Sequence, residues 1–184
     1  MSVRPVHVII AILVLVLAVA VILLRDRETP QEIEPGGAVR EDLGPGVQSV
    51  VLAFADREGL GMAEERREIA VPEDPAGRAK RILEELSRGP KGRDLVNTIP
   101  KDTEVRSVVF DDAGCAFVDF SRELVANHPG GSTGELLTIR SIVRTLSANF
   151  PEIESVRVLV EGKEIETIAG HIDASMPFLV DQYR

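Results

Sequence analysis

Hydrophobic positions divide the chain into a continuous apolar run, a polar stretch and a long segment with regularly spaced apolar residues. The apolar run covers residues 6–24, with His7 as its single polar member. A membrane-spanning helix needs about 20 apolar residues, so we expect residues 6–24 to form a transmembrane helix and remain as an uncleaved anchor. The alternative is a signal peptide cut near Ala18-Val19-Ala20, but such peptides usually have shorter apolar regions and this run continues to Leu24.

The polar stretch, residues 25–47, contains three prolines, four glycines and six acidic residues. Such a composition buries little apolar surface, so it predicts a flexible acidic tether; the alternative is a segment packed on the domain. Residues 1–5 precede the anchor as a short terminus. Lys and Arg counts on the two sides of the anchor leave its orientation open.

From residue 48 to residue 184 the pattern predicts one folded domain. Alternation and β-branched residues predict strands at 48–56, 67–72, 105–110, 115–120, 155–162 and 163–168. Helical spacing predicts helices at 74–88, 121–127 and 132–149. The element order indicates the α+β class, with two main helices packed on one face of a mostly antiparallel sheet.

Local signals mark the ends of the predicted helices. Asp74 is expected to cap the first helix, with Pro75 in its first turn and Gly89-Pro90 ending it. Ser121 is expected to cap the short second helix. In PGGSTGE, Ser132 and Glu135 have the S-x-x-E spacing of a capping box, which explains this stretch without a ligand. Anion binding by the exposed amides, or a nucleophilic Ser132, are the alternatives.

The long third helix carries an apolar stripe of Leu136, Ile139, Val143 and Leu146, widened by Ile142. Val156, Val158 and Val160 share one face of the strand that follows this helix. The stretch 111–114, Asp-Asp-Ala-Gly, lies between two strand patterns and predicts a hairpin.

Composition excludes several classes of partner. The formal net charge is -9, and beyond residue 24 it is 20 minus 30, or -10, which disfavours phosphate backbones. Aromatic residues make up 4% of the chain and Trp is absent, which disfavours a base-stacking platform. Cys115 is the single cysteine, so no intrachain disulfide forms, and its strand position predicts a buried, inert thiol.

Candidate chemistry is weak throughout the chain. A catalytic triad would combine Ser132 or Ser121 with the histidines and aspartates, but no G-x-S-x-G turn is present. The remaining triad candidates are His128, His171, Asp119 and Asp173. His128 is expected in an exposed loop, and His171 is expected to pack or bond locally. We therefore predict no catalytic residue and no cofactor.

Binding chemistry is equally weak. His171 with Asp173 lacks further metal ligands of recognisable spacing, so no metal is predicted. Pairs of carboxylates, as glycan cleavage needs, are unavoidable among 30 acidic residues and indicate nothing. Lys91 and Arg93 could contact phosphate, but a solvated loop is the simpler interpretation, and no phosphate-binding glycine motif is present.

The domain resembles the sporulation and spore germination domain, GerMN. The resemblance runs from Gln48 to Phe178, in a single copy, through NTIPKDT, CAFVDFSREL, GGSTGELL, VRVLVEGKEI and GHIDASMP. These pieces are weak singly and fairly specific together. The cysteine usual in lipoprotein members is absent here, and the apolar segment stands in its place.

The resemblance implies a fold similar to ring-building modules and a bacterial envelope protein, single-pass in the cytoplasmic membrane, with the domain outside. No catalytic residues carry over from it. The expected function is a non-enzymatic interaction or scaffold module linked to sporulation or germination. The alternative is a peptidoglycan-binding or wall-processing protein. Expected partners are other envelope proteins or peptidoglycan, with a homo-oligomer possible and no nucleic acid.

Overall fold

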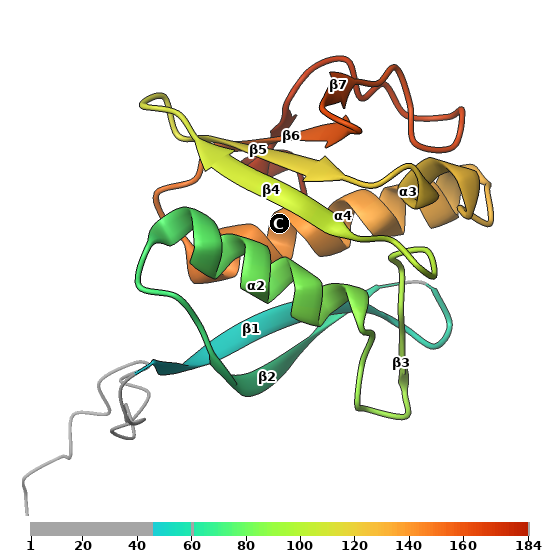
Figure 1. The fold of residues 1–184 in the computed structure, drawn as a ribbon. Coiled ribbons are helices and arrows are strands. Elements are labelled where there is room, and N and C mark those ends of the chain that lie inside the picture. Colours follow the sequence, from blue (N-terminus) through green and yellow to red (C-terminus); the bar gives the residue numbers. More distant parts are fainter. Residues whose placement is uncertain (1–45, 60, 184) are drawn as a thin grey trace, which may run out of the picture. The chain divides into compact units, whose positions relative to one another are not determined.

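Two β-sheets lie on either side of a pair of helices (Figure 1). The computed structural model describes residues 46–59 and 61–183. The predicted anchor at 6–24 and nearly all of the predicted tether lie outside these residues. Within the described ranges, no helix combines the length and apolarity needed to cross a bilayer. The first strand begins at Val47, where the tether was expected to end.

The first sheet has the order β2-β1-β3 and is antiparallel throughout. Its strands are β1 (Val47–Asp56), β2 (Met62–Ala70) and β3 (Leu95–Val96). The predicted strands at 48–56 and 67–72 are thus parts of one long hairpin. Helix α2 (Pro75–Ser87) follows β2 and packs on β1 and β4.

The second sheet has five strands in the order β4-β5-β6-β7, with β8 pairing β6. Its strands are β4 (Val105–Phe110), β5 (Cys115–Phe120), β6 (Ser155–Val160), β7 (Lys163–Glu164) and β8 (Phe178–Leu179). Strands β5 and β6 are parallel because the connection between them contains α3 (Glu123–Ala126) and α4 (Ser132–Asn149). A last helical turn, α5 (Val180–Tyr183), follows β8.

The α+β class, the mostly antiparallel pairing and the hairpin at 111–114 are confirmed. The expectation of one sheet with both helices on one face is wrong. Period-2 alternation identifies strands but not their partners, and the β1–β2 hairpin pairs with β3 instead of joining β4. The strand predicted at 163–168 shortens to β7, because the chain after Glu164 turns back toward α4.

Polar side chains of helix α4 hydrogen-bond to the backbone of β1 along one edge of the first sheet. The side chain of Asn149 accepts from Val51 N–H at 3.0 Å and donates to Val51 C=O at 2.7 Å. Thr145 Oγ1 accepts from Ala53 N–H at 2.9 Å. The backbone N–H and C=O groups of residues 51 and 53 point away from β2. The side chains of Asn149 and Thr145 therefore bond to backbone groups that a further strand would otherwise bind. The buried face of α4 is therefore wider than its predicted apolar stripe.

One apolar cluster joins both sheets and both main helices. The stripe residues Ile139, Ile142, Val143 and Leu146 are buried in it, as are Val156 and Val158 of β6. The described residues, 46–59 and 61–183, belong to one compact unit. Cys115 is buried at the start of β5, as predicted.

The helix caps differ from expectation at two of three positions. Asp74 caps α2 as predicted, its carboxylate accepting from Gly77 N–H. The N-cap of α3 is Arg122 and that of α4 is Gly131, and neither helix has a side-chain capping bond. The capping box of Ser132 and Glu135 is therefore wrong, and so is the cap by Ser121.

The contrast between Asp74, which caps a helix, and Ser132, which does not, can be tested with two alanine variants. Asp74→Ala should lower the free energy of unfolding by about 1 kcal/mol, the usual loss for a helix cap. Ser132→Ala should leave it unchanged within about 0.5 kcal/mol, because the Ser132 side chain is exposed and caps nothing. Urea denaturation of the two variants measures both values, and equal losses would contradict the assignment.

Candidate functional site

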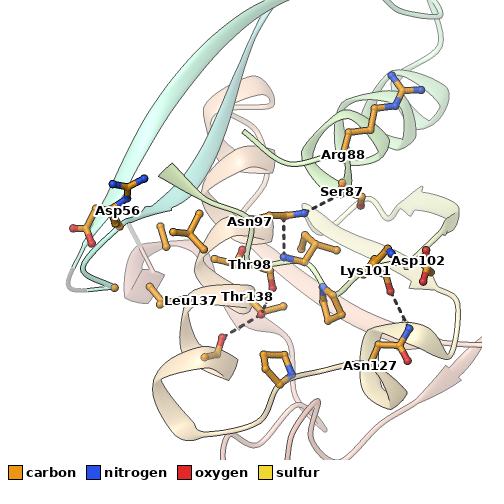
Figure 2. A pocket seen from close by; sticks show the side chains of 18 of the residues that line it. Asp56, Ser87, Arg88, Asn97, Thr98, Lys101, Asp102, Asn127, Leu137 and Thr138 are labelled. Carbon is orange, nitrogen blue, oxygen red and sulfur yellow. Dashed lines mark hydrogen bonds between the residues drawn. The ribbon is translucent and has the colours of Figure 1, made fainter. Parts of the chain in front are cut away.

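A cleft of about 660 Å³ opens beside β3. Figure 2 places Asp56 at one end and Lys101, Asp102 and Asn127 at the other, with Asn97 between them. Its walls come from the end of β1 and the turn after it, the segment after β3, the last turn of α2, and the first turns of α4. This volume is typical of sites for small molecules.

Side-chain hydrogen bonds tie these walls together. Asn97 Nδ2 donates to Ser87 C=O at 3.0 Å while its Oδ1 accepts from Ile99 N–H at 3.1 Å (Figure 2). Thr138 Oγ1 donates to Thr98 C=O at 2.6 Å, linking α4 to the segment after β3. At the far end, Asn127 Nδ2 donates to Lys101 C=O at 2.9 Å. The cleft is thus held open by bonds that need no ligand.

His128 contacts Thr138, which lines the cleft. We expected His128 to be exposed, and this expectation is wrong. Its ring is half-buried, Nδ1 accepts from Gly130 N–H at 3.0 Å, and Nε2 lies 3.0 Å from Thr138 Oγ1. Since Nδ1 accepts, the proton of the neutral ring sits on Nε2 and donates to Thr138. Burial lowers the pKa of His128 despite the opposing charge of Glu135, which favours this neutral form. In this tautomer Nε2 cannot accept a proton from a nucleophile.

Glu135 has a structural role that its spacing did not suggest. Its side chain is fully buried, and its carboxylate accepts from four backbone amides of the chain after β7. The donors are Ile168 and Ala169 to Oε1, and His171 and Ile172 to Oε2, at 2.8–3.2 Å. Burial raises the pKa of Glu135, but the four hydrogen bonds outweigh it and hold the pKa below its usual value. The backbone amides of segment 168–172 therefore bind an anion, and this anion is the Glu135 carboxylate of the same chain.

The triad candidates are dispersed, and each has a local partner. Ser132 is exposed, Ser121 Oγ accepts from Glu104 N–H, and Asp119 accepts from Gly162 N–H at 2.7 Å. Asp173 bonds the hydroxyl and amide of Ser175. Within the described ranges, neither histidine hydrogen-bonds to an aspartate. The described serine, histidine and aspartate candidates are therefore not arranged as a catalytic triad.

The remaining candidates also bond internally. His171 is exposed and bonds Ala169 C=O through Nδ1 at 2.8 Å, which confirms the expected local bonding. The amides of Lys91 and Gly92 donate to the Glu65 carboxylate, so a protein side chain already occupies the anion position in that loop. In the part of the chain that the structure describes, no three His, Cys, Asp or Glu residues could together hold a metal ion.

Sequence reasoning missed Arg67, which is 5% exposed within β2. Its guanidinium contacts the carboxylates of Glu65 at 2.6 Å and Glu85 at 2.9 Å, and donates to Gly89 C=O at 2.6 Å. These contacts join the hairpin to the last turn of α2, next to Ser87 and Arg88 of the cleft. An arginine between two charged neighbours in a strand gives no sequence signal for burial.

Comparison with known proteins gives one family and several similar folds. The model of the family Germane, described as sporulation and spore germination, matches residues 30–166. A solved candidate lipoprotein from Clostridium perfringens has a TM-score of 0.53 and 24% identity, covering 74% of this chain and 90% of its own. No curated protein sequence matches the chain.

Two structures of the sporulation protein GerM from Bacillus subtilis are also similar. The first GerMN domain gives a TM-score of 0.55 and 23% identity, covering 72% of this chain and 96% of its own. The tandem GerMN domains give 0.57 and 22%, covering 71% of this chain and 46% of theirs. The chain thus spans about half of the tandem structure. At these identities the likeness concerns the fold.

Proposed function

The chain belongs to the Germane family of sporulation and spore germination, and from this premise we propose that it is a non-enzymatic interaction module of the bacterial cell envelope. The module would act in sporulation or germination, as the family description suggests. It would recognise its partners through the cleft beside β3.

The observation that carries this proposal is the contrast between the cleft and the candidate catalytic groups. The cleft is held open by hydrogen bonds between its own walls, as a binding site should be. Meanwhile His128 carries its ring proton on the side that faces Thr138, and Glu135 is saturated by backbone amides. A shaped cavity beside which neither His128 nor Glu135 is free to transfer a proton favours binding over turnover.

Membrane attachment is the second part of the proposal. Residues 6–24 supply an apolar segment long enough for a single transmembrane helix, with residues 1–5 inside the cell and the domain outside. A protein of similar fold is described as a lipoprotein, which supports membrane attachment for a domain of this kind. Here the apolar segment would take the place of the lipid.

A cross-linked pull-down tests the proposal directly. The tagged full-length protein is cross-linked in its native membrane, and captured proteins are identified by mass spectrometry. We expect a defined set of envelope proteins whose recovery falls with Leu137→Asp in the cleft. The control is Thr133→Asp, an exposed position on the same helix that does not line the cleft.

Two other outcomes would replace the proposal. Retention of the protein on purified sacculi, without protein partners, would indicate a peptidoglycan-binding role. Turnover of muropeptides by the purified protein would contradict the non-enzymatic assignment, and the substitution Thr138→Val beside His128 would then be the first active-site test.

A further inference from the structure

The floor of the cleft is aliphatic. Val96 is 44% exposed on β3, and Leu137 and Pro129 approach the same space from α4 and the loop before it. None of the described lining residues is aromatic. Nucleobases bind proteins by stacking on aromatic rings, and sugar rings commonly do so as well. An aliphatic floor of this kind instead fits an aliphatic side chain.

The main chain next to this floor can pair with another chain. Ala55 pairs with Val96, and Arg57 N–H donates to Asp94 C=O at 3.0 Å, so alternate residues of this segment face β1. Asn97 follows Val96, so by this alternation it directs its own N–H and C=O away from β1. Neither group bonds to another described residue. An extended peptide can therefore add a short strand beside β3.

The charges around the cleft balance. Its charged lining residues are three acids and three bases, although the chain has an excess of acid: Asp56, Glu58 and Asp102, and Arg57, Arg88 and Lys101. Lys101 and Arg57 form no ion pair with another described residue, and Lys101 stands at the opposite end of the cleft from Asp56 (Figure 2). A balanced rim favours an occupant without net charge that offers both donors and acceptors.

We propose that the cleft binds an extended, uncharged peptide segment of another envelope protein. The peptide backbone pairs with the N–H and C=O of Asn97. One aliphatic side chain of the peptide seats on Val96 and Leu137. This inference rests on the proposed interaction function and adds the chemical class of the ligand.

The test uses a blocked tripeptide, acetyl-Ala-Leu-Ala-amide, as the probe. The full-length protein in detergent carries a photoreactive phenylalanine analogue at Val96, and adducts are measured by intact mass spectrometry. The matched position is Val109, which is 58% exposed on β4 and does not line the cleft. Chito-oligosaccharide, and the tripeptide with Asp in place of Leu, are the comparison ligands.

We expect peptide adducts at position 96 and few at position 109. Leu137→Asp should lower the yield about ten-fold, because removing the seat of one aliphatic side chain changes binding by at least that factor. Pro129→Asp gives a second variant in case Leu137→Asp unfolds the domain, and Thr133→Asp should have no effect. Adducts of equal yield at both positions, or a preference for the oligosaccharide or the Asp peptide, would overturn the inference.

Failure here is distinguishable from failure of the proposed function. Envelope proteins captured from the membrane, with no peptide adduct at position 96, would keep the interaction role and exclude this cleft as its peptide site. Peptide adducts at position 96 without captured envelope proteins would keep the cleft as a peptide site and contradict the proposed interaction role.

Discussion

Replacing Glu135 by glutamine should lower the free energy of unfolding by roughly 3 kcal/mol at pH 7, because hydrogen bonds to a charged group contribute about 1.5–3 kcal/mol each. The glutamine amide oxygen can still accept from two of the four amides. Its amide nitrogen would face the N–H groups of His171 and Ile172, which then lose their acceptor inside the protein. Urea denaturation measures the loss. Glu152→Gln, at an exposed position, is the control. A loss under about 1 kcal/mol would contradict the role of the carboxylate.

The same carboxylate predicts an acid response. The pKa of Glu135 is held below its usual value in the folded protein, so its contribution is present above the unfolded pKa, near 4.5. That contribution is lost as the pH falls through the folded pKa. The stability difference between the wild type and Glu135→Gln should therefore be constant near neutral pH and shrink below pH 4.5. A difference that stays constant into acid would contradict this titration.

Arg67→Ala should lower the free energy of unfolding by about 3–5 kcal/mol, because it removes buried hydrogen bonds to the carboxylates of Glu65 and Glu85, and bonds to charged groups contribute about 1.5–3 kcal/mol each. Burial raises the pKa of Glu85, and hydrogen bonds from Arg67 and Arg88 then lower it below the usual value. The substitution also leaves Gly89 C=O without its donor and uncovers the Phe54 ring, over which the guanidinium lies at 5.6 Å.

Three further variants separate the causes. Arg66→Ala changes the neighbouring, exposed arginine and should cost less than about 0.5 kcal/mol. Arg67→Lys should also destabilise, since one ammonium cannot reach the acceptors that the guanidinium fork bridges. Adding Glu85→Met to Arg67→Met should recover part of the loss. A double variant no more stable than the single one would show that the loss comes from packing and not from charge.

Local chemistry in the sequence predicted local structure well. Asp74 with Pro75 identified the start of α2, and the stretch 111–114 identified a hairpin, because each signal acts within a few residues. The apolar stripe of α4 and the alternation in β6 were right for the same reason. The resemblance to GerMN, which combined many such signals, is confirmed by the family match.

Long-range partners could not be predicted in this way. Glu135 has the spacing of a capping residue, yet its donors lie 33–37 residues away. Arg67 looks like one charge among many in β2, and its burial depends on where α2 ends. The cleft combines residues from β1 to α4, so no single stretch of the sequence predicts it. His128 was placed in a loop correctly, but its burial follows from Thr138 and Gly130 around it.

The contact between α4 and β1 also bears on how the protein avoids aggregation. The stretch Val50–Phe54 is apolar and uncharged, the composition that promotes intermolecular cross-β pairing when a strand edge is open. Thr145 and Asn149 occupy that edge within the same chain, so the N–H groups of Val51 and Ala53 and the C=O of Val51 are already hydrogen-bonded and closed to a foreign strand. At the opposite edge of the sheet, β2 presents Glu64, Arg66 and Glu68 to solvent. Along Val50–Phe54, one edge of the sheet is thus occupied and the other is charged, so amyloid-like growth finds no uncharged, open edge there. The edge that β3 leaves open is only two residues long.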